Sequence, residues 1–189
     1  MSNVSAFKIH QAVRCLQQGG TLAYPTESIY GLGCDPFNPA AVAHLLALKQ
    51  RADHKGLILV TANRQQVQTL WPELSSEHLA CLERSTLSEP ITWLLPDESG
   101  HIPPWIKGRH ALVAVRISAH PVVQQLCLAF GGAMVSTSAN VSGFHPARTA
   151  LQVRQQFQTG LDFVLTAALG GARKPSQIRD IRDGTIVRD

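Results

Sequence analysis

A dense group of small polar side chains follows an expected strand at residues 133–135. The segment Ser136–Gly143 holds four hydroxyl side chains, one carboxamide and a closing glycine. Hydroxyls and backbone N–H groups at the end of a buried strand can converge on an anion, most often a phosphate. An ordinary Ser/Thr turn has the same local composition. The segment alone therefore leaves two interpretations open, a phosphate site and a simple turn.

Four basic side chains lie where expected helices and strands end. Lys49 and Arg51 follow an expected helix, Lys55 precedes the next strand, and Arg116 lies near the end of another. Ligands of α/β proteins bind at such ends, and a contact that stabilises a developing oxyanion is worth roughly 3–4 kcal/mol. Alternatively, Lys49 would only complement the dipole of a solvated helix end. We expect Lys49 and Arg51 to face solvent, so that replacing either would leave stability nearly unchanged.

Two common groups of enzymes are disfavoured by missing motifs. The sequence contains neither Gly-x-x-x-x-Gly-Lys-Ser/Thr nor Gly-x-Gly-x-x-Gly, and residues 31–33 supply only a Gly-x-Gly. P-loop enzymes are thereby disfavoured. The Gly-x-Ser-x-Gly elbow of serine hydrolases is also missing. We therefore interpret the hydroxyls of Ser136 and Ser138 as ligand donors rather than nucleophiles.

The spacing of apolar residues predicts helices and strands in alternation. Strands are expected over residues 21–23, 57–60, 91–95, 111–117, 133–135, 163–165, 177–181 and 185–188, and helices over 9–16, 38–49, 63–70, 76–84, 121–130 and 149–157, with a loop at 96–108. This alternation predicts an α/β fold with a mixed sheet. Asp183-Gly184, between the last two strands, predicts an antiparallel hairpin.

Composition and length predict one domain over residues 1–189. Of these residues 44% are hydrophobic and 16% charged, which supports a buried core. A signal-peptide core and a membrane-length apolar run are both missing, so a cytoplasmic protein without membrane contact is expected. The four cysteines and eight histidines lack metal-ligand spacing, so no protein-bound metal is expected. The net charge of +4 suits a phosphate-rich substrate or weak contact with RNA.

Several motifs occur together in a characteristic order. They are Pro-Thr-Glu-Ser at residues 25–28, Lys-Gln-Arg at 49–51 and Ser-Thr-Ser-Ala-Asn-Val-Ser-Gly at 136–143. In this order the chain resembles the YrdC/TsaC family of threonylcarbamoyl-AMP synthases over nearly its whole length. The resemblance implies an open, twisted α/β sheet, mixed parallel and antiparallel and flanked by helices, with a concave basic cleft. It also implies that L-threonine, bicarbonate or CO2, and ATP react to give threonylcarbamoyl-AMP and diphosphate, with Mg²⁺ carried by the ATP.

The resemblance also implies a role for each candidate residue. Lys49 and Arg51 would be catalytic cations, and Thr26 and Arg116 would position threonine. The nucleotide and its phosphates would be bound by Lys55, Ser136, Ser138, Asn140, Arg148, Ser176 and Arg179. For Arg148 a plain surface role remains open.

One segment departs from the pattern of many relatives. Where they have Gly-Pro-x-Thr, this chain has Glu89-Pro90-Ile91-Thr92. Glutamate removes the backbone freedom of glycine and adds negative charge. If this loop faces the phosphates, the added charge would repel them.

Three functions follow as hypotheses. In the first, the product serves the threonylcarbamoyladenosine modification next to the tRNA anticodon, which a separate transferase complex completes, with weak direct tRNA binding at most. The second is a non-catalytic RNA-binding or ribosome-maturation factor that uses the same cleft, although only 6% of the residues are aromatic and few could stack on bases. The third is a carbamoyl-adenylate enzyme of hydrogenase maturation, whose usual relatives carry zinc-binding cysteine motifs that this sequence lacks.

Overall fold

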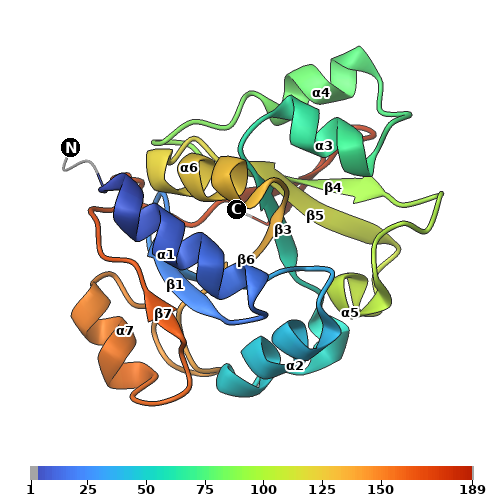
Figure 1. Ribbon diagram of the computed structural model, residues 1–189. Coiled ribbons are helices and arrows are strands. Elements are labelled where there is room, and N and C mark those ends of the chain that lie inside the picture. Colours follow the sequence, from blue (N-terminus) through green and yellow to red (C-terminus); the bar gives the residue numbers. More distant parts are fainter. Residues whose placement is uncertain (1–3, 189) are drawn as a thin grey trace.

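The computed structural model describes residues 4–188, in which nine strands form one continuous twisted sheet (Figure 1). The strands are β1 (Leu22–Pro25), β2 (Tyr30–Gly33), β3 (Ile58–Thr61), β4 (Ile91–Pro96), β5 (Leu112–Ile117), β6 (Met134–Ser138), β7 (Phe163–Val164), β8 (Gln177–Asp180) and β9 (Ile186–Arg188). They lie in the order β7-β1-β2-β6-β3-β5-β4-β8-β9. The pairs β1–β7, β3–β5 and β4–β8 are parallel and the others antiparallel, which confirms the expected mixed sheet.

Helices flank this sheet, and most begin at a capping side chain. They are α1 (Ala6–Gln17), α2 (Pro39–Leu48), α3 (Arg64–Leu70), α4 (Ser76–Leu82), α5 (Pro104–Lys107), α6 (Pro121–Phe130), α7 (Ala150–Gln156) and the 3₁₀ helix η1 (Asp53–Lys55). Asn38 and Asn63 accept backbone N–H groups at the starts of α2 and α3, and Thr149 and Gln152 form a capping box on α7. Such caps pair the N–H groups that a first turn leaves free, which is why sequence locates these starts well.

Two elements differ from the sequence expectation. The sequence does not predict β2, because two of its four residues are glycines, which disfavour strands. These glycines allow close packing: a Cβ on Gly33 would lie 2.5 Å from Val135 O and 2.8 Å from the ring of Tyr24. The expected loop at 96–108 contains the short helix α5, which ends at Gly108 with φ 63°. The expected closing hairpin is confirmed by the antiparallel pairing of β8 with β9.

The two faces of the sheet are covered unequally. Leu59 and Val60 are neighbours in β3, so their side chains point to opposite faces. Leu59 belongs to the larger core, which α2, α3, α4 and α7 complete, and Val60 to a second core beneath α1 and α6 (Figure 1). Ile58 shares the face of Val60 but is only half-buried. Part of this face is therefore left open by the helices.

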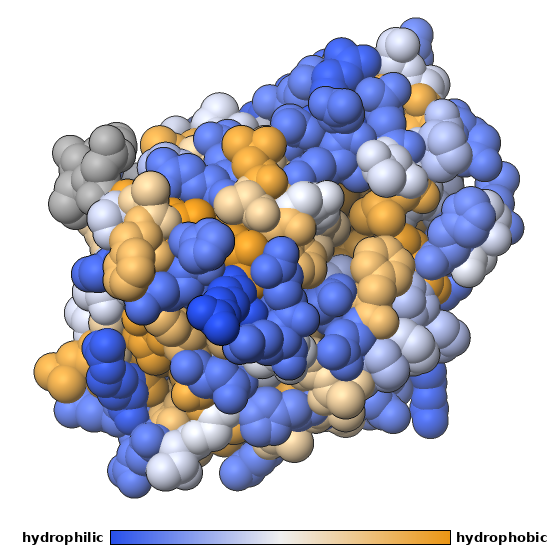
Figure 2. Space-filling view, in the orientation of Figure 1, coloured by the Kyte–Doolittle hydropathy of each residue, from blue (hydrophilic) through white to orange (hydrophobic). Residues whose placement is uncertain are grey.

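Large apolar side chains at the surface are scattered. Figure 2 shows small hydrophobic areas among hydrophilic residues over α1 and α6, and the exposed residues of these helices include Phe7 and Leu128. Single exposed hydrophobic residues are normal in globular proteins. Within residues 4–188, the helices are too short or too polar to cross a membrane.

We predict that Gly33→Ala destabilises the protein. Its Cβ would meet Val135 O and the Tyr24 ring at the short distances above, and such overpacking costs about 1–3 kcal/mol. Gly132→Ala is the matched control, because a Cβ there meets no atom within 4 Å. Urea denaturation should show a lower midpoint for Gly33→Ala alone, and equal midpoints would mean that the contact relaxes freely.

Candidate active site

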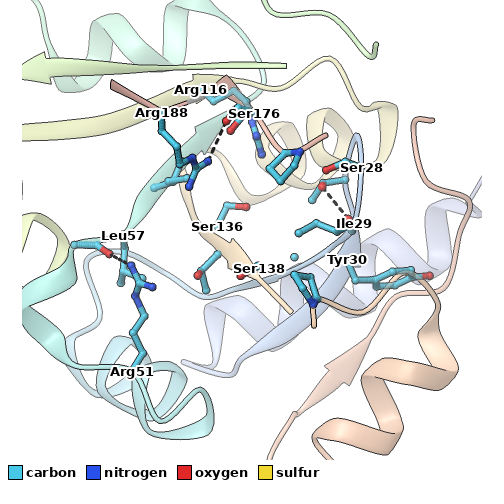
Figure 3. Close-up of a pocket in the computed structure, with 17 residues that line it drawn as sticks. Ser28, Ile29, Tyr30, Arg51, Leu57, Arg116, Ser136, Ser138, Ser176 and Arg188 are labelled. Atoms are coloured by element: carbon cyan, nitrogen blue, oxygen red, sulfur yellow. Dashed lines mark hydrogen bonds between the residues drawn. The ribbon is translucent and has the colours of Figure 1, made fainter. Parts of the chain in front are cut away.

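A cavity of about 230 Å³ opens at the uncovered part of the sheet (Figure 3). The turn between β1 and β2, the segment after η1, the loop before β8 and residues of β3, β5, β6 and β9 form its walls. Six of the residues singled out in the sequence line it, namely Thr26, Arg51, Arg116, Ser136, Ser138 and Ser176. The fold thus brings together residues from both ends of the chain.

The hydroxyl side chains of β6 form one wall. Ser136 and Ser138 are alternate residues of this strand, so both point to the cavity side. Ser138 Oγ donates to Asn140 Oδ1 at 2.6 Å, and Asn140 Nδ2 donates to Val141 O and Phe144 O, both at 3.0 Å. Asn140 lies outside the lining, and its carboxamide fixes the segment that follows Ser138.

Lys49 lies behind this segment, and the expectation that it faces solvent is wrong. The residue is only 2% exposed. Its Nζ donates to Ser138 O and, at 2.8 Å, to Asn140 O, while its own carbonyl accepts from Ser142 N at 2.8 Å. Burial first, and the charge of Arg51 second, lower the pKa of Lys49 to about 7. Lys49 therefore holds the hydroxyl wall in place from the protein side.

Arg51 reaches the cavity from the turn after α2. Its Nη2 donates to Gly56 O at 2.9 Å and to Lys55 O at 3.3 Å, so main-chain carbonyls fix the guanidinium. Burial lowers the pKa of Arg51. Lys55 is exposed and lines a neighbouring cavity of about 520 Å³ instead. Of Lys49, Arg51 and Lys55, Arg51 alone lines the candidate site.

A buried carboxylate, Glu27, anchors Arg116. Arg116 Nη2 lies 3.5 Å from Glu27 Oε2, and the two side chains are 8% and 1% exposed. Ser118 Oγ donates to Glu27 Oε1 at 2.6 Å. Burial by itself raises the pKa of Glu27, but Arg116 and Ser118 outweigh it and leave that pKa below its ordinary value. Sequence predicts no role for Glu27, although an acidic residue two positions after the buried strand β1 indicates a nearby cation if its side chain is buried.

The turn between β1 and β2 supplies Thr26 and Ser28 to the cavity. Thr26 Oγ1 donates to Ile29 O at 2.8 Å, so its proton is used within the turn. Toward a ligand, the Thr26 hydroxyl in this arrangement can only accept a hydrogen bond. Ser28 has no role predicted from sequence.

The last strand brings a further cation, Arg188. Its Nη2 donates to Ser176 O at 2.9 Å (Figure 3), and Ser176 Oγ shares a 2.8 Å hydrogen bond with Thr92 Oγ1. Burial, and then the nearby Arg116, lower the pKa of Arg188. Sequence reasoning misses Arg188 because it belongs to a short exposed strand without a motif.

Besides Lys49, Lys55 and Asn140, three further residues singled out in the sequence lie outside the lining of the cavity. Arg179 points to the opposite face of the sheet, where its guanidinium carbon lies 5.9 Å from the centroid of the Trp93 ring. Arg148 is exposed, just before α7. Glu89 is also exposed and lines a third cavity together with Arg179. The carboxylate of Glu89 therefore does not face the candidate site.

The lining combines hydroxyl groups with positive charge. Among residues 4–188, it includes the guanidinium groups of Arg51, Arg116 and Arg188 and no carboxylate side chain. Planar guanidinium groups match the oxygens of phosphates and carboxylates. Across residues 4–188, no cluster of three or more His, Cys, Asp or Glu side chains could hold a metal ion. The fold and the cavity define an α/β domain with a cavity whose lining is suited to anions, while anion binding and a wider basic cleft stay predictions.

The family follows from comparison with known proteins. Residues 14–189 match the Sua5/YciO/YrdC family model, whose description reads "Telomere recombination", and the chain belongs to this family. It is 46% identical to the threonylcarbamoyl-AMP synthase of Methylococcus capsulatus, with all of both chains covered. It is 47% identical to the protein of the same name from Pseudomonas aeruginosa, with 98% of each covered.

Solved structures confirm the fold expected from the resemblance. P. abyssi Sua5 complexed with L-threonine superposes with a TM-score of 0.85 at 27% identity, covering 98% of this chain and 54% of that one. E. coli YciO superposes with a TM-score of 0.79 at 22% identity, covering 100% of this chain and 91% of that one, which shows the fold alone.

We predict that Lys49 makes stability rise with pH above neutrality. Its pKa is about 7 in the folded protein against 10.5 in a free side chain, so between these values the unfolded chain binds more protons. The free energy of unfolding of the wild type should therefore increase relative to that of Lys49→Met between pH about 7 and about 10. Urea denaturation of both proteins across this range gives the difference, and a difference independent of pH would contradict the lowered pKa.

We predict that Glu27→Gln lowers the free energy of unfolding by about 3–5 kcal/mol, because it leaves the buried Arg116 without its counter-charge. The double variant Glu27→Gln/Arg116→Met serves as the control, since it removes both charges and should recover much of the loss. Chemical denaturation of the two variants checks this. Equal losses would assign the effect to packing instead of charge.

Proposed function

We propose that this protein is a threonylcarbamoyl-AMP synthase, which converts L-threonine, bicarbonate or CO2, and ATP into threonylcarbamoyl-AMP and diphosphate. The observation that carries the proposal is the cavity that gathers three guanidinium groups and the hydroxyls of Ser136 and Ser138, with no carboxylate among the described residues that line it. The name of the full-length relatives and the threonine complex of P. abyssi Sua5 support it.

The reaction needs positioning and charge more than a reactive side chain. The threonine amine adds to CO2 and loses a proton, which gives a carbamate. A carbamate oxygen then attacks the α-phosphorus of ATP, the bond to the bridging oxygen breaks, and diphosphate leaves. Because no protein nucleophile takes part, the enzyme accelerates the reaction by orienting the reactants and stabilising the charge that develops.

The cavity residues suit these tasks. Arg116, fixed by Glu27, would bind the threonine carboxylate, with Thr26 accepting a hydrogen bond from the same substrate. Arg51 and Arg188 would stabilise the negative charge of the phosphates. Ser136 would donate to a phosphate oxygen, and Ser138 would turn its hydroxyl from Asn140 to the nucleotide.

Lys49 would act from behind this wall, and Ser176 would border the nucleotide. Mg²⁺ would arrive bound to the phosphates of ATP, as is usual for this cation. Contact of Lys55, Arg148 or Arg179 with the nucleotide would need a ligand that extends beyond the cavity.

The product would be consumed in tRNA modification in the cytoplasm. A separate transferase complex would attach the threonylcarbamoyl group to the adenosine next to the anticodon. Any direct tRNA contact would be weak, driven by phosphate and steeply weakened by salt. The family match over residues 14–189 supports one domain over residues 1–189.

The deciding experiment incubates pure protein with ATP, labelled bicarbonate and threonine. The proposal requires diphosphate release that depends on all three substrates, together with a labelled and labile adenylate. Diphosphate release without threonine would contradict it. No release, combined with tight and salt-insensitive binding to one RNA, would favour the RNA-binding alternative.

We predict that Arg51→Ala lowers kcat by about a hundredfold or more, the loss typical of one electrostatic donor. Arg109→Ala is the matched control, because Arg109 is exposed and lies outside the cavity. Steady-state diphosphate release measures both variants. Near-normal turnover of Arg51→Ala would remove Arg51 from the site.

We predict that threonine is preferred to serine modestly and to valine strongly. A missing methyl group costs on the order of 10- to 200-fold, whereas a site that hydrogen-bonds a hydroxyl can reject a ligand without it by ~10⁴-fold or more. Thr26, with its proton already used, is the group proposed to pair with the threonine hydroxyl. The kcat/KM values for the three amino acids decide, and valine performing as well as serine would withdraw the role of Thr26.

A further inference from the structure

The segment after β6 forms a closed loop beside the candidate site. Residues 140–146, called loop 140–146 below, leave the sheet after Ala139 and return at Ala147, whose N–H donates to Ala139 O at 2.9 Å. Pro146, the last residue of the loop, lines the cavity although it is exposed. At the other end, Ser138 of the hydroxyl wall lies just before the loop. The position of the loop therefore affects two parts of the cavity lining.

Two side chains from the sequence motifs hold the first part of this loop. Lys49 Nζ donates to Asn140 O at 2.8 Å. The carboxamide of Asn140 donates to Val141 O and to Phe144 O, each at 3.0 Å. These contacts extend along the loop as far as Phe144. The part that returns to the cavity at Pro146 is held by another residue.

That residue is Gln156, the half-buried last residue of α7. Its Oε1 accepts from Val141 N at 3.3 Å, and its Nε2 donates to His145 O at 2.8 Å. A carboxamide offers a donor and an acceptor on separate atoms, which this position requires. The next residue, Phe157, is 5% exposed and belongs to the larger core, so the end of α7 is itself fixed. One side chain thus joins both limbs of the loop to the core.

The contact of Gln156 with His145 fixes the edge of the cavity. His145 directly precedes Pro146, and the peptide bond between them is planar, so a shift of the His145 carbonyl moves the proline ring with it. Proline has no backbone N–H with which to anchor itself. Gln156 lies outside the lining of the cavity. It therefore acts on the lining through the loop.

We propose that Gln156 is a positioning residue of the candidate site, which holds loop 140–146 so that Pro146 and the Ser138 hydroxyl meet the phosphates of the nucleotide. This assignment rests on the proposed function, because ATP is the phosphate-bearing substrate of that reaction. The groups assigned to threonine belong to the turn after β1 and to β5, which lie outside this loop. Loss of the Gln156 carboxamide therefore weakens the binding of ATP and spares that of threonine.

The test removes the carboxamide and keeps the length of the side chain. Gln156→Met does this with a residue of similar helix propensity, and Gln155→Met, at the exposed preceding position of α7, is the matched control. Steady-state diphosphate release gives the KM values for ATP and for threonine. We expect Gln156→Met to raise the KM for ATP at least about fivefold, the factor for one hydrogen bond. The KM for threonine should stay within about twofold, less than one hydrogen bond accounts for. Gln155→Met should match the wild type.

Amide hydrogen exchange measures the loop without relying on catalysis. The Val141 N–H should exchange about fivefold faster in Gln156→Met, because its acceptor is lost. The Ala147 N–H, at the base of the loop, should keep its rate, which separates a loosened loop from an unfolded protein. Gln156→Ala guards against misfolding of the first variant, since alanine has the highest helix propensity. It should change the exchange of Val141 and the KM for ATP in the same direction.

Three results would overturn the positioning role of Gln156 and leave the proposed function standing. The first is a KM for ATP within about twofold of the wild type in both folded variants, less than one hydrogen bond accounts for. The second is an equal rise of the KM values for ATP and threonine, which would mean a general disturbance of the cavity. The third is unchanged exchange of the Val141 N–H.

Failure of the proposed function gives a different result. If the wild type releases no diphosphate, the function is removed, and calorimetric titration with inorganic tripolyphosphate replaces the KM for ATP. Weaker binding of tripolyphosphate by Gln156→Met than by Gln155→Met would then still support Gln156 as a positioning residue for a phosphate ligand. Equal binding by these two variants would overturn that role as well.

Discussion

The candidate site depends on one buried lysine side chain. Lys49 Nζ binds the carbonyl oxygens of Ser138 and Asn140 together, and a buried carbonyl without a partner would cost about 1–3 kcal/mol. This contact joins the end of α2 to the end of β6. Arg51 stands two residues after Lys49, so one short turn of chain positions both the hydroxyl wall and the cation beside it. A shift of Lys49 would therefore displace the hydroxyl wall and Arg51 together.

The charge of the cavity is fixed by a second buried contact. Glu27 balances the charge of Arg116 and accepts a hydrogen bond from Ser118. Its carboxylate is therefore paired inside the protein. The partners of Arg51 and Arg188 within residues 4–188 are carbonyl oxygens. The described lining of the cavity therefore carries more positive than negative charge, and an anionic ligand would balance it. This is the electrostatic reason for relating the cavity to phosphates and carboxylates.

Local pattern predicted the parts of the fold that local forces determine. Caps such as Asn38 and Thr149 mark helix starts because their partners lie within three residues. The alternating α/β order and the closing hairpin follow in the same way. The sequence does not predict β2, because its glycines are needed for close packing against Val135 and Tyr24, which lie elsewhere in the chain.

The site was predictable where motifs mark it and not where packing decides. The hydroxyl segment, Arg51 and Arg116 carry motifs and line the cavity. The burial of Lys49 depends on a segment about ninety residues away, which helical periodicity cannot register. Arg188 has no motif, and its position follows only from the pairing of β8 with β9.

The alternation of β8 has a consequence for the evolution of chain length. Ser176 and Ile178 face the two cavities, whereas Arg179 faces the Trp93 side of the sheet. Inserting or deleting a single residue here would turn the guanidinium of Arg179 to the cavity face of the sheet and the hydroxyl of Ser176 away from it. The loop at 165–174 lies outside the strand, whereas the turn at 181–185 sets the register that brings Arg188 to the cavity. Changes in chain length at this end of the gene are therefore expected before β8 rather than within β8 or the hairpin turn.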